Sequence, residues 1–292
     1  MKSRNKTPNY SLFVLLSGFF SACVTCSIKL TDGTLELGQI LFVRYFPLAV
    51  LSLACLLIKG IGLKTSCPAY SSARSISGIL AVVFFTLAAQ KIPVATAQAL
   101  FYCSPLFTAI LFCWVSLRKG NPVALRILPL IPICLGGVFL INKPHLISSE
   151  LPYISLGFAS AFFLSCASLS LKKLGALKES PLRTIFYFAS ACTLTGIIIN
   201  AIQKTDLLAG FFSPISWALF LFTLLQQLTV TLGWGRGSTL LNCVFQFFGV
   251  PCAIFIGLVI FEESLSSSEL TGITILVTTE ASALWMMRER KD

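Results

Sequence analysis

The sequence predicts an all-α integral membrane protein with ten transmembrane helices, arranged as two inverted five-helix repeats with both termini in the cytoplasm. Three observations lead to this fold class: the composition, an internal repeat and the placement of basic residues. Of the 292 residues, 56% are hydrophobic, only 11% are charged and 25 are Phe. That leaves too little polar surface to coat a soluble globule of this size, so the chain belongs in a bilayer.

The internal repeat relates the two halves of the chain. Residues 11–30 and 155–174 share identical residues at a constant offset of 144 positions. The matched pairs are Ser11/Ser155, Leu12/Leu156, Phe19/Phe163, Ser21/Ser165, Lys29/Lys173 and Leu30/Leu174. Because the chain is about twice as long as this offset, we expect one repeat over 1–146 and a second over 147–292. Many membrane transporters are built from such a duplicated half.

Ten apolar stretches are long enough, or nearly so, to cross a membrane. A hydrocarbon core of about 30 Å needs roughly 20 apolar residues per helix. The expected spans are 10–29, 37–58, 75–90, 93–117, 124–142, 152–171, 184–202, 214–233, 238–261 and 270–287. The third span is short, so we expect Arg74 and Lys91 at its ends to extend toward the membrane surfaces.

The basic residues support this count of spans and orient the chain. With the N-terminus inside, 17 of the 22 Lys and Arg residues fall on the cytoplasmic side, as the positive-inside rule requires. Five spans per half is an odd number, so the second half enters the membrane in the opposite orientation. The net charge of +11 is dispersed along the chain, which argues against nucleic acid as a partner. We expect a multi-pass protein of the bacterial cytoplasmic (inner) membrane.

Two prolines at corresponding positions predict where a substrate would bind. Pro105 and Pro251 lie at the centres of the fourth and ninth spans, 146 residues apart. Each proline lacks an N–H, so the carbonyls of Phe101 and Phe247 lose their helical partners. A simple structural kink is the alternative explanation, because prolines are common in membrane helices. Aromatic and amide residues before both prolines favour a cavity lining and complete the candidate site. They are Gln98, Phe101 and Tyr102, and Asn242, Gln246, Phe247 and Phe248.

Two charged residues lie inside predicted spans. Arg44 either anchors a substrate carboxylate or phosphate, or it has a structural role through an ion pair or an extended side chain. Glu280 either binds a proton or a cationic group, or it is neutral and hydrogen-bonded to Thr278 or Thr279.

The sequence contains patterns that resemble enzyme or metal-binding motifs, but their surroundings argue against those functions. The Cys23-x-x-Cys26 pair lies within a hydrophobic span without a second ligand pair, and His145 is the only histidine. We therefore expect no catalytic residue, metal or cofactor. The expected partners are a small-molecule substrate and membrane lipids, with the chain acting as a monomer or a homodimer.

Several segments resemble the drug/metabolite transporter superfamily, EamA type. They are RYFPLAVLSLACLL in the second span, KIPVATAQALFYCSPLFTAILF around the fourth, and FFGVPCAIFIGLVIFEESLSSSELTGITIL at the end. The resemblance covers essentially the whole chain and implies a central cavity with peripheral fifth and tenth helices, which weakens the case for Glu280. The first half departs from the pattern, since no glutamate follows Pro105 as Glu262 follows Pro251.

The resemblance implies secondary transport of a small polar or zwitterionic metabolite by alternating access. One branch of the superfamily, found in obligate intracellular bacteria, is similar in size and layout and takes up S-adenosylmethionine in exchange for S-adenosylhomocysteine. This uptake is our first hypothesis, with exchange favoured over proton coupling. The alternatives are an amino-acid or drug exporter of the same superfamily, and a non-transporting membrane or lipid-handling protein.

Overall fold

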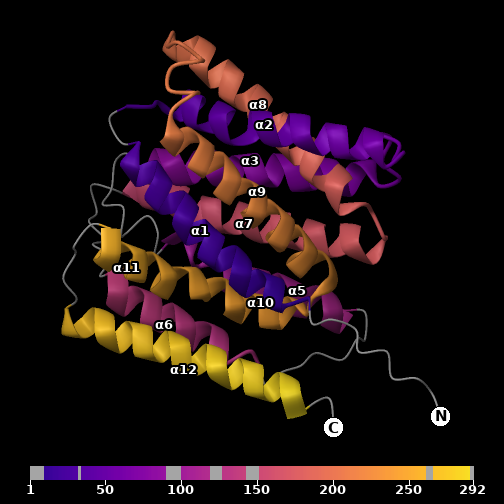
Figure 1. The fold of residues 1–292 in the computed structure, drawn as a ribbon. Coiled ribbons are helices and arrows are strands. Elements are labelled where there is room, and N and C mark those ends of the chain that lie inside the picture. The colour runs from indigo at the N-terminus through magenta and orange to yellow at the C-terminus, as the bar shows by residue number, and fades with distance from the viewer. Residues whose placement is uncertain are drawn as a thin grey trace.

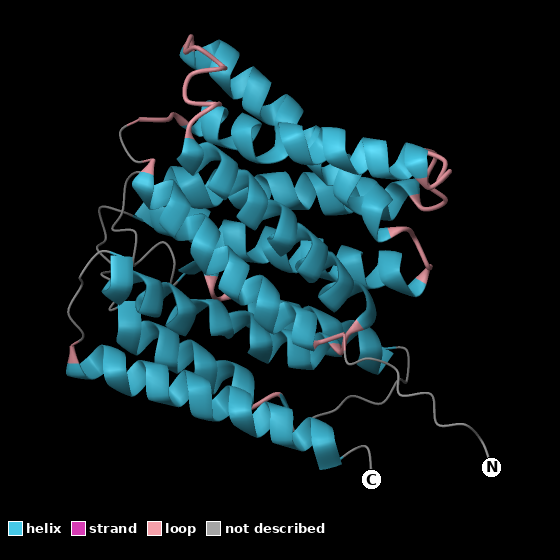
Figure 2. Cartoon of the chain, in the orientation of Figure 1, coloured by secondary structure: helices cyan, strands magenta, loops and turns pink. Residues whose placement is uncertain are grey.

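The computed structural model describes residues 10–31, 34–89, 100–118, 127–142, 151–260 and 266–289. Every regular element in these ranges is helical, and the connections between helices are short loops and turns (Figure 2). With α10, η3 and α11 counted as one interrupted helix, the described residues form ten helices. The expected all-α fold is therefore confirmed.

The order of the helices along the chain can be followed in Figure 1. Their bounds are α1 Leu12–Leu30, α2 Leu37–Ile58, α3 Pro68–Ala89, α5 Ser104–Arg118, α6 Leu130–Asn142, α7 Leu151–Ala176, α8 Pro181–Gln203, α9 Pro214–Arg236, α10 Thr239–Phe245, the 3₁₀ helix η3 Gln246–Phe248, α11 Gly249–Ile260 and α12 Ser267–Glu289.

Local sequence signals explain several of these bounds. The backbone N–H of Glu36 donates to Oε1 of Gln39 at 2.8 Å, which satisfies a donor at the start of α2. At the start of α9, the hydroxyl of Ser213 accepts from the backbone N–H of Ser216 at 3.2 Å, and Pro214 follows the cap. Pro181 plays the same part at the start of α8.

Five described segments are long and apolar enough to cross a membrane by length and composition: Leu37–Ile58, Leu151–Ala176, Pro181–Gln203, Pro214–Arg236 and Thr239–Val259. Three shorter apolar helices, Leu12–Ile28, Ser104–Arg118 and Leu130–Ile141, accompany them. The third helix differs from expectation, because α3 begins at Pro68 rather than at residue 75. Arg74 therefore lies a full turn and a half inside α3 and is buried, so the prediction that it extends to the surface was wrong.

Helices from the two halves pack against each other. The most extensive contacts join α2 to α8, α3 to α7, α1 to α9 and α6 to α12. In Figure 1, α2, α3 and α8 form one end of the bundle, α6 and α12 form the other, and α1, α7 and α9 run between them.

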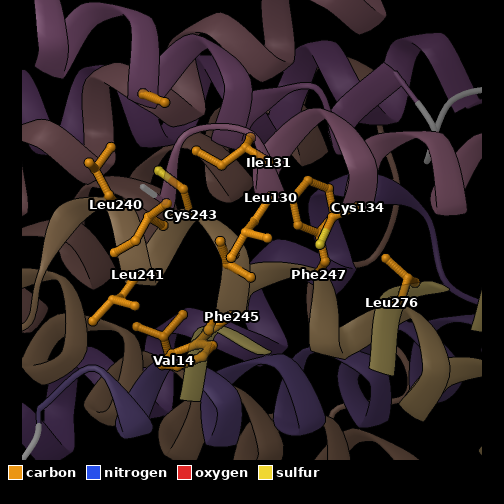
Figure 3. Close-up of a cluster of buried hydrophobic side chains, with 14 of the residues drawn as sticks. Val14, Leu130, Ile131, Cys134, Leu240, Leu241, Cys243, Phe245, Phe247 and Leu276 are labelled. Carbon is orange, nitrogen blue, oxygen red and sulfur yellow. The ribbon is translucent and has the colours of Figure 1, made fainter. Parts of the chain in front are cut away.

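Two hydrophobic clusters account for most of the buried apolar side chains. The larger one joins α6, α10, η3 and α11, and includes Phe245 and Phe247, neither of which is exposed (Figure 3). The second lies between α2 and α8 around Tyr45 and Phe188. The candidate site residues divide between these two regions.

A polar network ties the connection between α2 and α3 to the start of α8. The Thr65 hydroxyl donates to Glu179 at 2.7 Å, and Arg183 forms an ion pair with the same carboxylate. Arg183 also donates to the carbonyl of Gly62 at 2.9 Å. Burial raises the pKa of the Glu179 carboxyl, but the Thr65 hydrogen bond and the Arg183 charge outweigh burial and hold this pKa below its usual value of 4.5.

Glu179→Gln is expected to lower the thermal stability of the protein at pH 7. A carboxyl whose pKa is lowered by folding contributes stability above its unfolded pKa, and that contribution is lost as the pH falls through the folded value. The difference in melting temperature between wild type and variant should therefore be present at pH 7 and shrink below about pH 4.5. A difference that stays constant down to pH 3 would show that the charge of Glu179 is unimportant.

Candidate functional site

The ninth membrane helix is interrupted at the position that Pro251 predicts. Helix α10 ends at Phe245, one 3₁₀ turn covers Gln246–Phe248, and α11 starts at Gly249. Pro251 thus occupies the first turn of α11, where the missing N–H disturbs little. Because Pro251 has no N–H, the carbonyl of Phe247 lacks the helical partner four residues later, as the sequence predicts.

A second interruption lies in the fourth membrane helix. Leu100 and Phe101 are helical, Tyr102 and Cys103 form a turn, and α5 starts at Ser104. Pro105 is the second residue of α5, so its missing N–H falls where no intrahelical bond is required. Both paired prolines therefore start the second segment of an interrupted helix, and the break precedes each of them.

The two breaks contact each other. Nε2 of Gln246 donates to the hydroxyl of Ser104 at 3.1 Å. The rings of Tyr102 and Phe247 are stacked, with centroids 6.0 Å apart and planes at 27°. The hydroxyl of Ser165, on α7, lies 2.8 Å from the carbonyl of Ser104 and can donate to it. Polar and aromatic groups from both halves of the chain thus meet at the interrupted helices.

A small cavity of about 50 Å³ lies beside these breaks. Its lining comes from α1, α6, α11 and Tyr102, and consists of Ser21, Ala22, Thr25, Tyr102, Ile141, Gly249, Val250, Ala253 and Ile254. Sites for organic ligands usually enclose about 300–1,000 Å³. This cavity as described is therefore too small to enclose an organic metabolite.

The cavity borders a close crossing of α1 and α11. A Cβ atom on Gly18 would lie 2.9 Å from the backbone nitrogen of Gly249. A Cβ atom on Gly249 would lie 3.0 Å from the carbonyl oxygen of Gly18 and 3.1 Å from the hydroxyl oxygen of Tyr102. Only glycine at both positions permits this approach.

The structure does not bring all the predicted residues together. Phe101 lies next to Tyr102, with ring centroids 6.4 Å apart, and Phe248 is half-buried in η3. Asn242 is fully buried at the connection from α9 to α10, where Nδ2 donates to the carbonyl of Gly233 at 2.9 Å. Gln98 lies outside the described residues.

Arg44 lies apart from the helix breaks, beside the second hydrophobic cluster. Its side chain is buried, Nε donates to the hydroxyl of Thr223 on α9 at 3.2 Å, and the guanidinium lies 5.1 Å from the centre of the Tyr45 ring. The ion pair considered for Arg44 is not formed within the described part of the chain.

Glu280 faces the helix bundle although α12 lies at its edge. The residue is buried, and its Oε1 atom has no hydrogen-bond partner. Thr278 and Thr279 donate their hydroxyls to carbonyls of α12, at 2.7 Å from Thr274 and 2.6 Å from Ile275, and not to Glu280. The threonine hydroxyls therefore do not make the hydrogen bonds of the alternative in which Glu280 is neutral.

Glu280→Gln is expected to leave the melting temperature of the purified protein at pH 8 unchanged or to raise it. The amide has the same shape as the carboxyl and removes a group that is unfavourable when ionised in a buried position. A fall of more than about 3 °C, roughly 1 kcal/mol for a chain of this size, would contradict this prediction and indicate a stabilising partner of the carboxyl.

Two polar positions escaped prediction from the sequence. Thr223, the partner of Arg44, is an unremarkable threonine within an apolar helix. Arg74 was placed at the end of a span because the apolar run begins at residue 75, whereas Pro68 was the available signal for an earlier helix start.

Comparisons with known proteins agree with a membrane transporter. No protein-family profile matches the chain. Two proteins named pseudopaline exporter CntI, from two strains of Pseudomonas aeruginosa, are each 26% identical over 273 residues, which cover 91% of this chain and 92% of each exporter. An uncharacterized transporter from Helicobacter pylori strain J99 is 31% identical over 143 residues, 48% of this chain and 46% of that protein.

A solved crystal structure shares the fold. It superposes with a TM-score of 0.80 at 14% sequence identity and covers 95% of this chain and 97% of its own. The chain is thus similar over nearly its whole length to proteins named as membrane transporters, and its helical fold is one already known from a crystal.

Proposed function

We propose that the chain is a secondary transporter that moves a small polar organic metabolite across the bacterial inner membrane by alternating access, without converting it chemically. The observation that carries this proposal is the meeting of two interrupted helices, through Gln246 and Ser104 and through Tyr102 and Phe247. Interrupted helices at corresponding positions are the usual substrate sites of transporters with inverted repeats. The transporter names of the relatives add independent support.

The packing of the helices supports the inverted repeat. An inverted repeat would make α1 equivalent to α7, α2 to α8, α3 to α9, α5 to α11 and α6 to α12. Each major contact between two helices should then recur between the two helices equivalent to them. The contact of α1 with α9 then corresponds to that of α7 with α3, and α1 with α11 corresponds to α7 with α5. The contacts of α2 with α8 and of α6 with α12 each join a helix to its own equivalent, so exchanging the two halves leaves them unchanged. This pattern is expected of two halves related by a two-fold axis.

Export is the direction we favour, because relatives matching over nine-tenths of the chain are named exporters. Membership of the EamA-type branch of the drug/metabolite transporters, cytoplasmic termini, and a monomeric or homodimeric state are parts of the same proposal. They follow from the sequence resemblance and the charge distribution described above.

Counterflow in proteoliposomes tests the proposal. Vesicles are loaded with one unlabelled compound from a panel of amino acids, di- and tricarboxylates and adenosine metabolites, and the same labelled compound is added outside. Transient accumulation above that in empty vesicles is expected for at least one compound. If folded protein gives none across the panel, the chain is the non-transporting membrane protein considered as an alternative.

Uptake of S-adenosylmethionine in exchange for S-adenosylhomocysteine is the second candidate. The stacked rings of Tyr102 and Phe247 favour it, since aromatic surfaces are suited to an adenine ring. Cells that express the chain should then take up labelled S-adenosylmethionine, and unlabelled S-adenosylhomocysteine should compete. Absence of both effects would eliminate this candidate and leave export of another metabolite.

A further inference from the structure

Two arginines are buried in neighbouring helices of the bundle. Arg44, on α2, is 8% exposed, and Arg74, on α3, is 6% exposed. Both lie well inside their helices, α2 Leu37–Ile58 and α3 Pro68–Ala89. Arginines inside membrane helices are rare and expensive, and they usually line a path for a substrate or an ion. We refer to these two residues as the arginine pair.

The arginine pair contacts neutral acceptors only. Nε of Arg44 donates to the hydroxyl of Thr223 at 3.2 Å, and Nη2 of Arg74 donates to Oε1 of Gln227 at a long 3.5 Å. Nε of Arg74 is buried without any hydrogen-bond partner. No carboxylate within the described ranges forms an ion pair with either arginine. Five N–H groups on each guanidinium thus have far fewer acceptors than they need.

The two arginines bind acceptors on the same face of α9. Their acceptors, Thr223 and Gln227, are four residues apart on α9, so they occupy the same face one helical turn apart, about 6 Å. Both guanidiniums also act electrostatically on the same two groups, Tyr45 and Cys192. The contacts of α2 and α3 with α8, and of α2 with α9, enclose this region.

Aromatic rings hold the guanidiniums in place. Arg44 lies 5.1 Å from the centre of the Tyr45 ring and Arg74 lies 4.0 Å from that of Phe188. Tyr45 and Phe188 contact each other edge to face, with centroids 5.5 Å apart. The rings of Tyr45 and Phe188 thus lie in sequence between the two guanidiniums, each ring in contact with one of them. Gly78, one turn beyond Arg74 on α3, leaves the space that the Arg74 guanidinium and Phe188 occupy, and a Cβ atom there would collide with both.

Neutral acceptors and rings cannot neutralise two like charges in a buried site. Removing an ion from water costs several kcal/mol even after relaxation, and each of the two arginines carries that cost. A purely structural pair of arginines would need carboxylates beside it. Two cations with unused hydrogen-bond donors are instead suited to a negatively charged ligand. The guanidinium group of arginine binds carboxylate and phosphate groups through bidentate hydrogen bonds.

We propose that Arg44 and Arg74 together form an anion site between α2, α3 and α9, and that the transported substrate carries at least two negative charges, as two carboxylates or one phosphate. This inference rests on the proposed transport function and specifies its substrate class. It disfavours S-adenosylmethionine, whose sulfonium and ammonium groups would be repelled by the arginine pair.

Thermal unfolding of the purified protein tests the anion site. Succinate, citrate and inorganic phosphate are compared with chloride at constant ionic strength, and lysine serves as a cationic probe. A di- or tricarboxylate or phosphate should raise the melting temperature of the wild type by about 3 °C, because a ligand that binds only the folded state stabilises it. Comparing the carboxylates with phosphate shows which kind of anion the site binds. Lysine should leave the melting temperature unchanged.

Variants connect the shift to the arginine pair. Arg44→Gln and Arg74→Gln should each abolish it, whereas Arg118→Gln should keep it, because Arg118 is exposed and lies on Trp114. Arg74→Lys keeps the positive charge but cannot form bidentate hydrogen bonds, so it should reduce the anion-induced shift in melting temperature only in part. Without added anion, both Gln variants should melt at or above the wild-type temperature, since each removes an uncompensated charge. If the two arginines had only a structural role, both Gln variants should melt below the wild-type temperature.

Two results would overturn the inference: no anion shifts the wild type, or the shift persists in both Gln variants. The outcome is separable from that of the transport proposal. Counterflow without an anion shift would remove the arginine site and leave the transporter, whereas an anion shift that depends on both arginines without counterflow of any compound would leave a binding site and remove transport.

Discussion

Gly249→Val is expected to abolish counterflow while the protein still inserts into the membrane. A Cβ atom at Gly249 would lie 3.0 Å from the carbonyl oxygen of Gly18 and 3.1 Å from the Tyr102 hydroxyl, and valine adds two methyl groups beyond it. Because the first contact is with backbone, α1 and α11 must separate. Overpacking of this kind costs about 1–3 kcal/mol, and the displacement also moves the break that contacts the fourth helix.

The matched control for this variant is Gly136→Ala. Gly136 lies within α6, and a Cβ atom there would meet nothing within 4 Å. Alanine should be tolerated and should stabilise the helix by up to about 1 kcal/mol, because glycine is the poorer helix former. Initial rates of counterflow and melting temperatures are measured for both variants. Transport by Gly249→Val at the wild-type rate would show that the crossing of α1 and α11 is not part of the transport path.

Tyr102→Ala is the second variant with a large expected effect, a loss of transport of at least about tenfold. The ring of Tyr102 stacks on Phe247, and its side chain also lines the cavity beside Gly249. Its removal eliminates an aromatic contact between the two halves and leaves a void. A loss of about 1.4 kcal/mol from the interaction with the moving cargo would account for a tenfold effect.

Two further variants separate the contributions of Tyr102. Tyr102→Phe keeps the ring and should retain most of the rate. Phe255→Ala, on α11, truncates a ring that is 66% exposed, and should therefore leave transport intact. If Tyr102→Ala and Phe255→Ala lower the rate equally, the effect comes from general destabilisation rather than from the helix breaks.

The sequence predicted much of the fold because membrane helices have few alternatives. Composition and length define apolar spans, and the positions of Lys and Arg alternate with them. The paired prolines Pro105 and Pro251, singled out in the sequence, each lie in the first turn of a helical segment. The kink considered as the alternative is not what the described residues form, because each proline lies in the first turn of a new helical segment.

The contacts within the site could not be derived from the chain alone. Ser104 and Gln246 are 142 residues apart, and a hydrogen bond between them depends on how two halves pack. The burial of Arg74 was missed for a similar reason. Hydropathy starts the third span after a run of small and polar residues, but α3 extends back to Pro68 and packs against α7 and α8, with Ser71 and Arg74 of that run buried. Tertiary contacts here override the local preference of the residues.

The most direct test of transport at the helix breaks is water access to the cavity. Ala253→Cys introduces a thiol into the cavity lining, and Phe255→Cys introduces one on the exposed face of the same helix, α11. Both are treated in proteoliposomes with a membrane-impermeant maleimide, and peptide mass spectrometry distinguishes them from the native cysteines. A transporter that opens at the breaks should be labelled at residue 253 and protected at residue 255 by lipid. Labelling only at 255, or at neither residue, would contradict the account.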